Sequence, residues 1–146
     1  MAVTRRQQIL EALIARMQEI QIANGYATDA GLAVHIGDVP LFGADDPTEV
    51  IVIVAQETRP GANRVEILPV EFQAVATVAL DQPYLAAEAV LSEITRAMEV
   101  EDRTLGGLVK DMTIGPTRLL AREPGSTTVG VGQLYDLTYV RPWGAA

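Results

Sequence analysis

The chain contains no cysteine and only one histidine among its 146 residues. The absence of cysteine excludes disulfide bonds, thiol catalysis and cysteine metal sites, and it fits a reducing compartment. The single histidine, His35, excludes metal sites built from several histidines and mechanisms that need two of them. We therefore expect no metal and no cofactor.

Long apolar runs and an excess of positive charge are also missing. No stretch reaches the roughly 18–20 apolar residues of a membrane span, and the first residues lack the apolar core of a signal peptide. The net charge of −8 disfavours binding to phosphate backbones or to anionic membranes. Since 49% of the residues are apolar, we expect one globular domain over residues 1–146.

A first helix is predicted over residues 5–23. Thr4 and Gln7 fit a capping box, and Asn24-Gly25 supplies a left-handed stop. One face of this helix is apolar, with Ile9, Leu10, Leu13, Ile14, Met17 and Ile20.

A second helix is predicted over residues 82–98. Asp81 is a good N-cap residue, and Pro83 suits a first turn. Its apolar stripe consists of Tyr84, Ala87, Leu91, Ile94 and Met98.

Five segments have the composition of strands. The segment 50–55 is apolar at every position, which is typical of a strand covered on both faces. Two helices can cover only one face of a sheet, so this strand indicates cover from neighbouring subunits. The expected strands are 32–36, 50–55, 65–80, 112–121 and 128–141.

The segment 65–80 is long for a domain of this size, since it would span about 53 Å if it were straight. Its apolar residues change from odd to even positions near Pro69, which predicts a bulge or bend at Leu68-Pro69. In the second part, Val70–Leu80, apolar and polar residues alternate regularly, and this part alone is still longer than the strand that a domain of this size needs. We take this excess as an indication of assembly.

The predicted order is α-β-β-β-α-β-β. It corresponds to an α/β (α+β) fold, a mixed, mostly antiparallel sheet packed by two helices on one face. Gly130 and Gly132 in the last strand predict a weakened start or a close backbone approach.

Several charged residues are candidates for a site, each with a simpler alternative. Asp45 and Asp46 could form an acid/base or metal pair with His35 nearby, but Asp-Asp-Pro is also a common turn. Glu99, Glu101 and Asp102 could hold a hard cation, yet they lack the spacing of a calcium loop. We interpret these groups, with Arg103, Arg118 and Arg122, as protein-contact surfaces and not as catalytic residues.

Three stretches are similar to tailed-bacteriophage tail terminators, the lambda-type minor tail protein U group. They are the opening helix Arg6–Ile14, the loop Phe42-Gly43-Ala44-Asp45-Asp46-Pro47 before an apolar strand, and the close Tyr135-Asp136-Leu137-Thr138-Tyr139-Val140. With the helix after the long strand, the similarity spans most of residues 4–142.

The resemblance implies a non-enzymatic virion protein of the tail, assembled in the host cytoplasm. Such proteins form a hexameric ring that caps the tail tube, ends its polymerisation and joins it to neck or head-completion proteins. The acidic charge suits a lumen through which genome DNA passes without specific binding. The alternatives are a neck or head-completion protein, or a small α/β ligand-binding module or enzyme that uses His35, Asp45 and Asp46.

Overall fold

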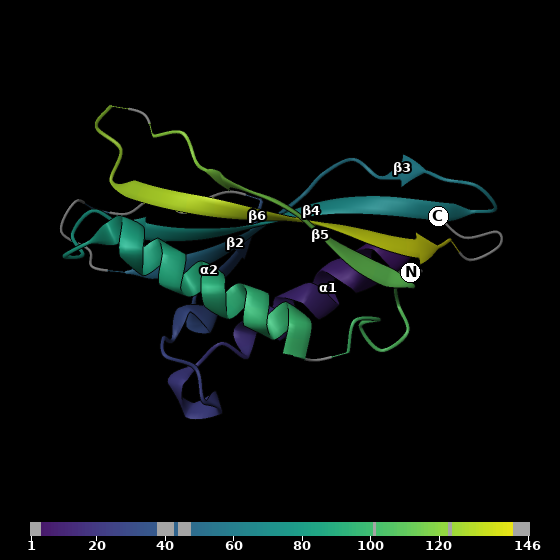
Figure 1. Ribbon diagram of the computed structural model, residues 1–146, viewed down its shortest axis with the longest axis horizontal. Helices are drawn as coiled ribbons and strands as arrows, with labels where there is room; N and C mark the ends of the chain where they lie inside the picture. Colours follow the sequence, from purple (N-terminus) through teal and green to yellow (C-terminus); the bar gives the residue numbers. More distant parts are fainter. Residues whose placement is uncertain (1–3, 38–42, 44–47, 101, 123, 142–146) are drawn as a thin grey trace.

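The computed structural model describes residues 4–37, 43, 48–100, 102–122 and 124–141. Six strands form one mixed sheet, and both helices pack against the same face of it (Figure 1). The predicted α+β fold is therefore confirmed, with one additional two-residue strand, β3. The elements are α1 (Arg5–Gln18), β1 (Val34–Ile36), β2 (Glu49–Ala55), β3 (Arg59–Pro60), β4 (Val65–Thr77), α2 (Pro83–Val100), β5 (Asp111–Leu119) and β6 (Thr128–Val140), with short 3-10 turns η1 (Ile22–Asn24) and η2 (Ala30–Leu32).

The strands are ordered β1-β2-β4-β6-β5, and β3 pairs with the first part of β4. The β1–β2 pair is parallel and every other pair is antiparallel. β4 and β6 pair over their whole length, from Val65 opposite Val140 to Thr77 opposite Thr128. This long pair is the centre of the sheet.

β4 is one continuous strand, so the predicted bulge or bend at Leu68-Pro69 is wrong. The pairing of β4 with β6 shows no register shift. The even positions of β4 face the helices along its whole length. Val65 and Ile67 are at odd positions and therefore lie on the other face of the sheet. Pro69 is tolerated in β4 because β2 ends beside it. The carbonyl of Pro69 accepts from the N–H of Gln56, which lies one residue beyond β2. In an antiparallel strand the N–H of a residue points to the same side as its carbonyl, so the N–H that Pro69 lacks would also point beyond the end of β2.

β2 is buried on both faces, as predicted, but its own chain provides the cover. Val50 is 2% exposed and Val52 is fully buried, in a small second cluster with Val75 that Leu120 also contacts. The later part of β4 is likewise paired on both sides, with β2 and with β6. Neither strand therefore requires a neighbouring subunit, and this part of the sequence argument for assembly is wrong.

α1 begins where predicted and ends five residues early. The Thr4 hydroxyl accepts from the N–H of Gln7 at 3.0 Å, as expected for an N-cap. The helix ends at Gln18 because the carbonyl of Ile20 accepts a tertiary hydrogen bond of 2.8 Å from the N–H of Gly31. This contact turns the chain into η1 and η2 and overrides the helical pattern of the following residues.

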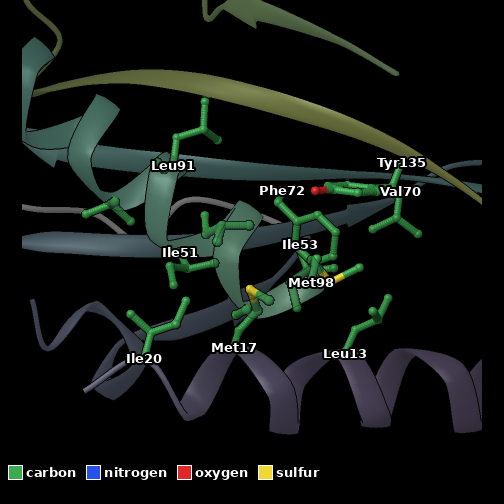
Figure 2. Close-up of a cluster of buried hydrophobic side chains, with 14 of the residues drawn as sticks. Leu13, Met17, Ile20, Ile51, Ile53, Val70, Phe72, Leu91, Met98 and Tyr135 are labelled. Carbon is green, nitrogen blue, oxygen red and sulfur yellow. The ribbon is translucent and has the colours of Figure 1, made fainter. Parts of the chain in front are cut away.

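α2 supplies the second layer of the core (Figure 2). Gln82 and not Asp81 occupies the N-cap position, since its carbonyl accepts the first helical hydrogen bond from Ala86. Tyr84 is 41% exposed, because the buried positions centre on Val90 and Ile94 and leave it at the margin of the stripe. The core joins Ile9, Leu13, Met17, Ile51, Ile53, Val70, Phe72, Ile94, Met98 and Tyr135.

Candidate functional site

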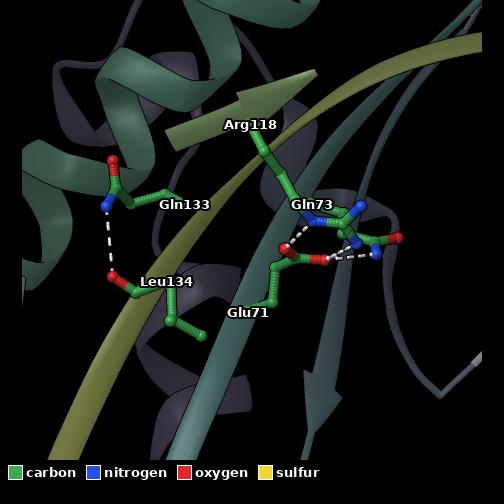
Figure 3. A network of polar contacts seen from close by, with 5 residues as sticks. All are labelled: Glu71, Gln73, Arg118, Gln133 and Leu134. Carbon is green, nitrogen blue, oxygen red and sulfur yellow. Dashed lines mark hydrogen bonds and ion pairs between the residues drawn. The ribbon is translucent and has the colours of Figure 1, made fainter. Parts of the chain in front are cut away.

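The sheet face that the helices leave uncovered carries an ion pair that spans three strands. Arg118 of β5 reaches across β6 to Glu71 of β4, with Nε 2.5 Å from Oε2 and Nη2 2.8 Å from Oε1 (Figure 3). The side-chain amide of Gln73 donates to the same carboxylate at 2.8 Å. The pair is therefore bidentate, the strongest arrangement of a guanidinium and a carboxylate.

Burial makes this pair asymmetric. The side chain of Glu71 is 6% exposed and that of Arg118 is 58% exposed. The hydrogen bonds from Arg118 hold the pKa of Glu71 below its usual value, although burial acts in the opposite direction. Glu71 in turn raises the pKa of Arg118. Arg118 thus forms its ion pair with a buried carboxylate of its own chain and not with a partner.

Gly132 makes room for the carboxylate of this ion pair, and Gly130 makes room for the side chain of Leu120. A Cβ on Gly132 would lie 2.9 Å from the carboxyl carbon of Glu71, and one on Gly130 would lie 2.8 Å from Leu120 Cδ1. The predicted close approach at these glycines is confirmed. The contact is made by side chains that cross the strand.

β5 is an edge strand with an irregularity between Ile114 and Thr117. Gln133 of β6 fills the gap: its amide nitrogen donates to the carbonyl of Gly115 at 2.7 Å, and its oxygen accepts from the Thr117 hydroxyl at 2.7 Å. These hydrogen-bonding groups at the bulge therefore all have partners. The bulge also makes β5 irregular, which hinders the pairing of a further strand from another chain with this edge of the sheet.

The loop after α2 holds two of the predicted contact residues, Asp102 and Arg103. Asp102 accepts from the N–H and hydroxyl of Thr104 and from the N–H of Gly106, and these bonds lower the pKa of Asp102. Arg103 donates to Asp111 at 2.9 Å and to the carbonyl of Met112 at 2.8 Å. Asp102 therefore shapes the turn, and Arg103 caps part of the β5 edge.

A cavity of about 310 Å³ lies beside this loop, and Glu99, Arg103 and Tyr135 line it together with apolar side chains of α2 and β5. Burial raises the pKa of Tyr135, and the carboxylate of Glu99 adds to this effect. The cavity therefore combines charged and hydroxyl groups with apolar side chains.

The structure does not bring the predicted contact residues into one surface. Glu99, Asp102 and Arg103 lie near the start of β5, whereas Arg118 and Arg122 belong to its far end and the following hairpin, where Arg122 donates to the carbonyl of Ser126 at 3.1 Å. Asp45, Asp46 and Glu101 lie outside the described residues. His35 is half-buried on β1, opposite Val52. Sequence reasoning missed Glu71, although a glutamate within a long apolar strand was a visible signal.

A second hollow, of about 610 Å³, lies on the uncovered face next to the ion pair. Pro69 and Leu134 form its apolar part. Arg59 and Asp136, 3.5 Å apart, and Gln56 and Glu57 supply polar groups around them. This mixture of an apolar centre and a charged rim is typical of a protein-contact surface.

Within the described ranges, no group of three or more histidine, aspartate or glutamate side chains is placed to hold a metal ion. None of the helices in the described part of the chain is long and apolar enough to cross a bilayer. Comparison with protein-family models and with curated proteins finds no match to this chain.

Proposed function

We propose that this protein is a structural component of a bacteriophage tail or a related tail-like particle, a terminator that caps the tail tube as a ring. In this role it is not an enzyme: it stops tube polymerisation and offers a surface to the neck or head-completion proteins. Its place would be the tail of the virion, after assembly in the host cytoplasm. The similarity of the opening helix, the loop at 42–47 and the closing strand supports this proposal.

The observation that carries the proposal is the uncovered sheet face. Both helices lie on the opposite side, so the hollow around Leu134 and Pro69 is open to a partner. At its edge, Arg59 and Asp136 lie 3.5 Å apart and provide one charge of each sign. An apolar centre with a charged rim suits a contact with the tube or the neck.

The test adds the purified protein to polymerising tail-tube subunits and measures tube length by electron microscopy. We expect tubes to stop growing and to carry a ring at one end. Tubes that continue to grow contradict the proposal. Binding to DNA-filled heads without any effect on tubes would instead identify a neck or head-completion protein.

A matched pair of variants connects this activity to the uncovered face. Leu134→Glu places a charge in the hollow, and Leu85→Glu places the same charge on an exposed position of α2. We expect the first variant to lose tube arrest and the second to keep it. The opposite result would move the contact to the helical side of the molecule.

The acidic charge leads to a further expectation about DNA. Because the chain carries a net charge of −8, its ring would gain nothing from counterion release at phosphates. Genome DNA would then pass through the lumen without specific binding. Measurable DNA binding by the assembled ring at physiological salt contradicts this expectation.

A further inference from the structure

The cavity of about 310 Å³ lies between the end of α2 and the edge strand β5, on the helix side of the sheet. Met98, Met112 and Tyr135 form its floor, and all three are buried members of the core. Glu99 and Ile114 are exposed at its mouth. Small-molecule sites have volumes of about 300–1,000 Å³, so this cavity has room for one small ligand.

Tyr135 brings a polar group without a partner to this cavity. The residue is 3% exposed, and its buried hydroxyl makes no hydrogen bond with a described residue. The neighbouring hydroxyl of Thr95 donates instead to the carbonyl of Leu91 at 3.1 Å. Figure 2 shows Tyr135 on the helix side of the sheet near Met98, which lines the same cavity. A buried hydroxyl that has lost water without gaining a partner is costly, and a ligand that supplies the partner removes this cost.

The charge that is available to a ligand in this cavity is negative. Arg103, the cation of the rim, already donates to Asp111 at 2.9 Å and to the carbonyl of Met112 at 2.8 Å. Glu99 makes no ion pair or hydrogen bond with a described residue. It belongs to the last turn of α2, where the free carbonyl groups of the helix add negative potential. Its carboxylate also raises the pKa of Tyr135, so the carboxylate and the hydroxyl are neighbours.

These groups together define the chemistry of a ligand. An ammonium or amidinium group has several N–H donors, so it can donate both to the carboxylate of Glu99 and to the hydroxyl oxygen of Tyr135. The thioethers of Met98 and Met112 make favourable contacts with an aromatic ring. The small volume limits the ligand to a single aromatic ring.

We propose that this cavity is a binding site for a small aromatic cation, an amine or amidine on a single aromatic ring. The cation pairs with Glu99 and donates to Tyr135, and the aromatic ring lies against Met98 and Met112. The cavity is on the helix side of the sheet, whereas the proposed contact with the tube or the neck uses the uncovered face. The binding site therefore does not depend on the proposed function in a tail.

Benzamidine is the probe, and its binding is measured by NMR of protein that carries ¹³C in the methionine methyl groups. The chain has four methionines; Met98 and Met112 line the cavity, and Met17 does not. We expect saturable shifts of the Met98 and Met112 signals, caused by the ring current of the probe, and none of the Met17 signal. Shifts that do not saturate up to about 10 mM, or that include Met17 equally, overturn the proposal.

Matched ligands test the charge and the aromatic ring separately. Benzamide has the shape of benzamidine without its charge, and benzoate has the opposite charge. We expect benzamide to bind about tenfold more weakly and benzoate not to bind. N-acetyl-arginine methylamide carries a similar forked cation on a flexible chain, as the side chain of a partner protein would. If it or benzamide binds as tightly as benzamidine, the proposal of an aromatic cation is wrong.

Variants test the two polar residues of the site. Glu99→Gln should weaken the binding of benzamidine by about tenfold and leave the binding of benzamide unchanged, because only the charge is removed. Tyr135→Phe should weaken the binding of benzamidine by about threefold or more. It should still fold, since the hydroxyl has no hydrogen bond to lose.

The matched controls are Glu88→Gln and Tyr84→Phe, which make the same changes at exposed positions of α2. We expect both to bind benzamidine like the unchanged chain. Unchanged affinity in both site variants, or equal losses in the controls, overturns the proposal. If tubes are arrested but benzamidine does not bind, the binding site is wrong and the proposed function stands. If benzamidine binds as expected but tubes keep growing, the reverse holds.

Discussion

The carboxylate of Glu71 lies over Gly132, so close that a Cβ built on the glycine would stand 2.9 Å from the carboxyl carbon. Gly132 is opposite Gln73 on one side and Arg118 on the other, so the guanidinium passes over it to reach β4. A slip of either pairing by one residue would turn the side chains to the other face. The ion pair therefore exists only in the native register of three strands.

Gly132→Ala should destabilise the protein by about 1–3 kcal/mol, because the added methyl group displaces a carboxylate that Arg118 holds in place. Urea unfolding measures the free energy of unfolding. In a Glu71→Ala background the same substitution should cost much less, since the carboxylate that the added methyl group would meet is then absent. Equal costs in the two backgrounds would show that the strain lies in the backbone of β6.

Arg118→Met should reduce the free energy of unfolding by about 2 kcal/mol. The substitution leaves the buried carboxylate of Glu71 without its cation, and the partial exposure of Arg118 keeps the loss below the value for fully buried pairs. Arg122→Met, in the neighbouring hairpin, is the control and should stay within about 0.5 kcal/mol of the unchanged protein. A loss of similar size in both variants would place the effect in the hairpin and not in the pair.

Two glutamates should give opposite pH dependences of stability. The pKa of Glu71 is lowered, mainly by the hydrogen bonds from Arg118, so its contribution is present above the ordinary value of 4.5 and is lost as the pH falls through the folded-state pKa. The pKa of Glu49 is raised by burial and by Glu93, so its ionised form opposes folding at neutral pH and this penalty disappears as the pH falls through the raised pKa.

Urea unfolding between neutral pH and about pH 3 checks both signs. Glu49→Gln should stabilise the protein at neutral pH by a few tenths to about 1 kcal/mol and should have no benefit once Glu49 is protonated. Arg118→Met should differ most from the unchanged protein at neutral pH and least in acid. A benefit of Glu49→Gln that grows toward acid pH would contradict the assigned direction.

Gly31→Ala should be severe, with a loss of at least about 3 kcal/mol. A Cβ at this position would lie 2.5 Å from the carbonyl oxygen of Met17 and 2.6 Å from that of Ile20. Both are backbone atoms at the end of α1, so neither can move without disturbing the helix. Gly61→Ala, whose nearest contact would be 3.2 Å, should cost less than about 1 kcal/mol. Thermal unfolding compares the two.

The sequence was most informative where a pattern is local. The apolar periods of both helices, the doubly apolar β2 and the alternation of β4 after Pro69 are all confirmed. The end of α1 was misplaced because Ile20 bonds to Gly31, a contact that no helical pattern contains. The phase change near Pro69 was misread because apolar residues also occupy the uncovered face, where they are only partly buried.

The charged groups were harder to place, since their roles depend on residues far away in the sequence. Arg118 and Glu71 belong to strands that β6 separates, so neither residue predicts the other. Glu49 and Lys110 lie at opposite ends of the sheet, and this placement can be recognised only from the register of β2, β4 and β6. The predicted close approach at Gly132 is the exception, because a glycine inside a strand is itself a local signal.

The pairing of β4 with β6 also fixes the order of events during synthesis. β4 lies near the middle of the chain, and its main partner is β6. Val65 can pair only after Val140 has been synthesised, and Thr77 only after Thr128. Pairings between such distant segments form slowly and leave apolar strands exposed in the meantime. A nascent chain that has not yet released β6 from the ribosome cannot complete its sheet. A partner that binds the complete sheet can therefore be bound only after β6 has left the ribosome.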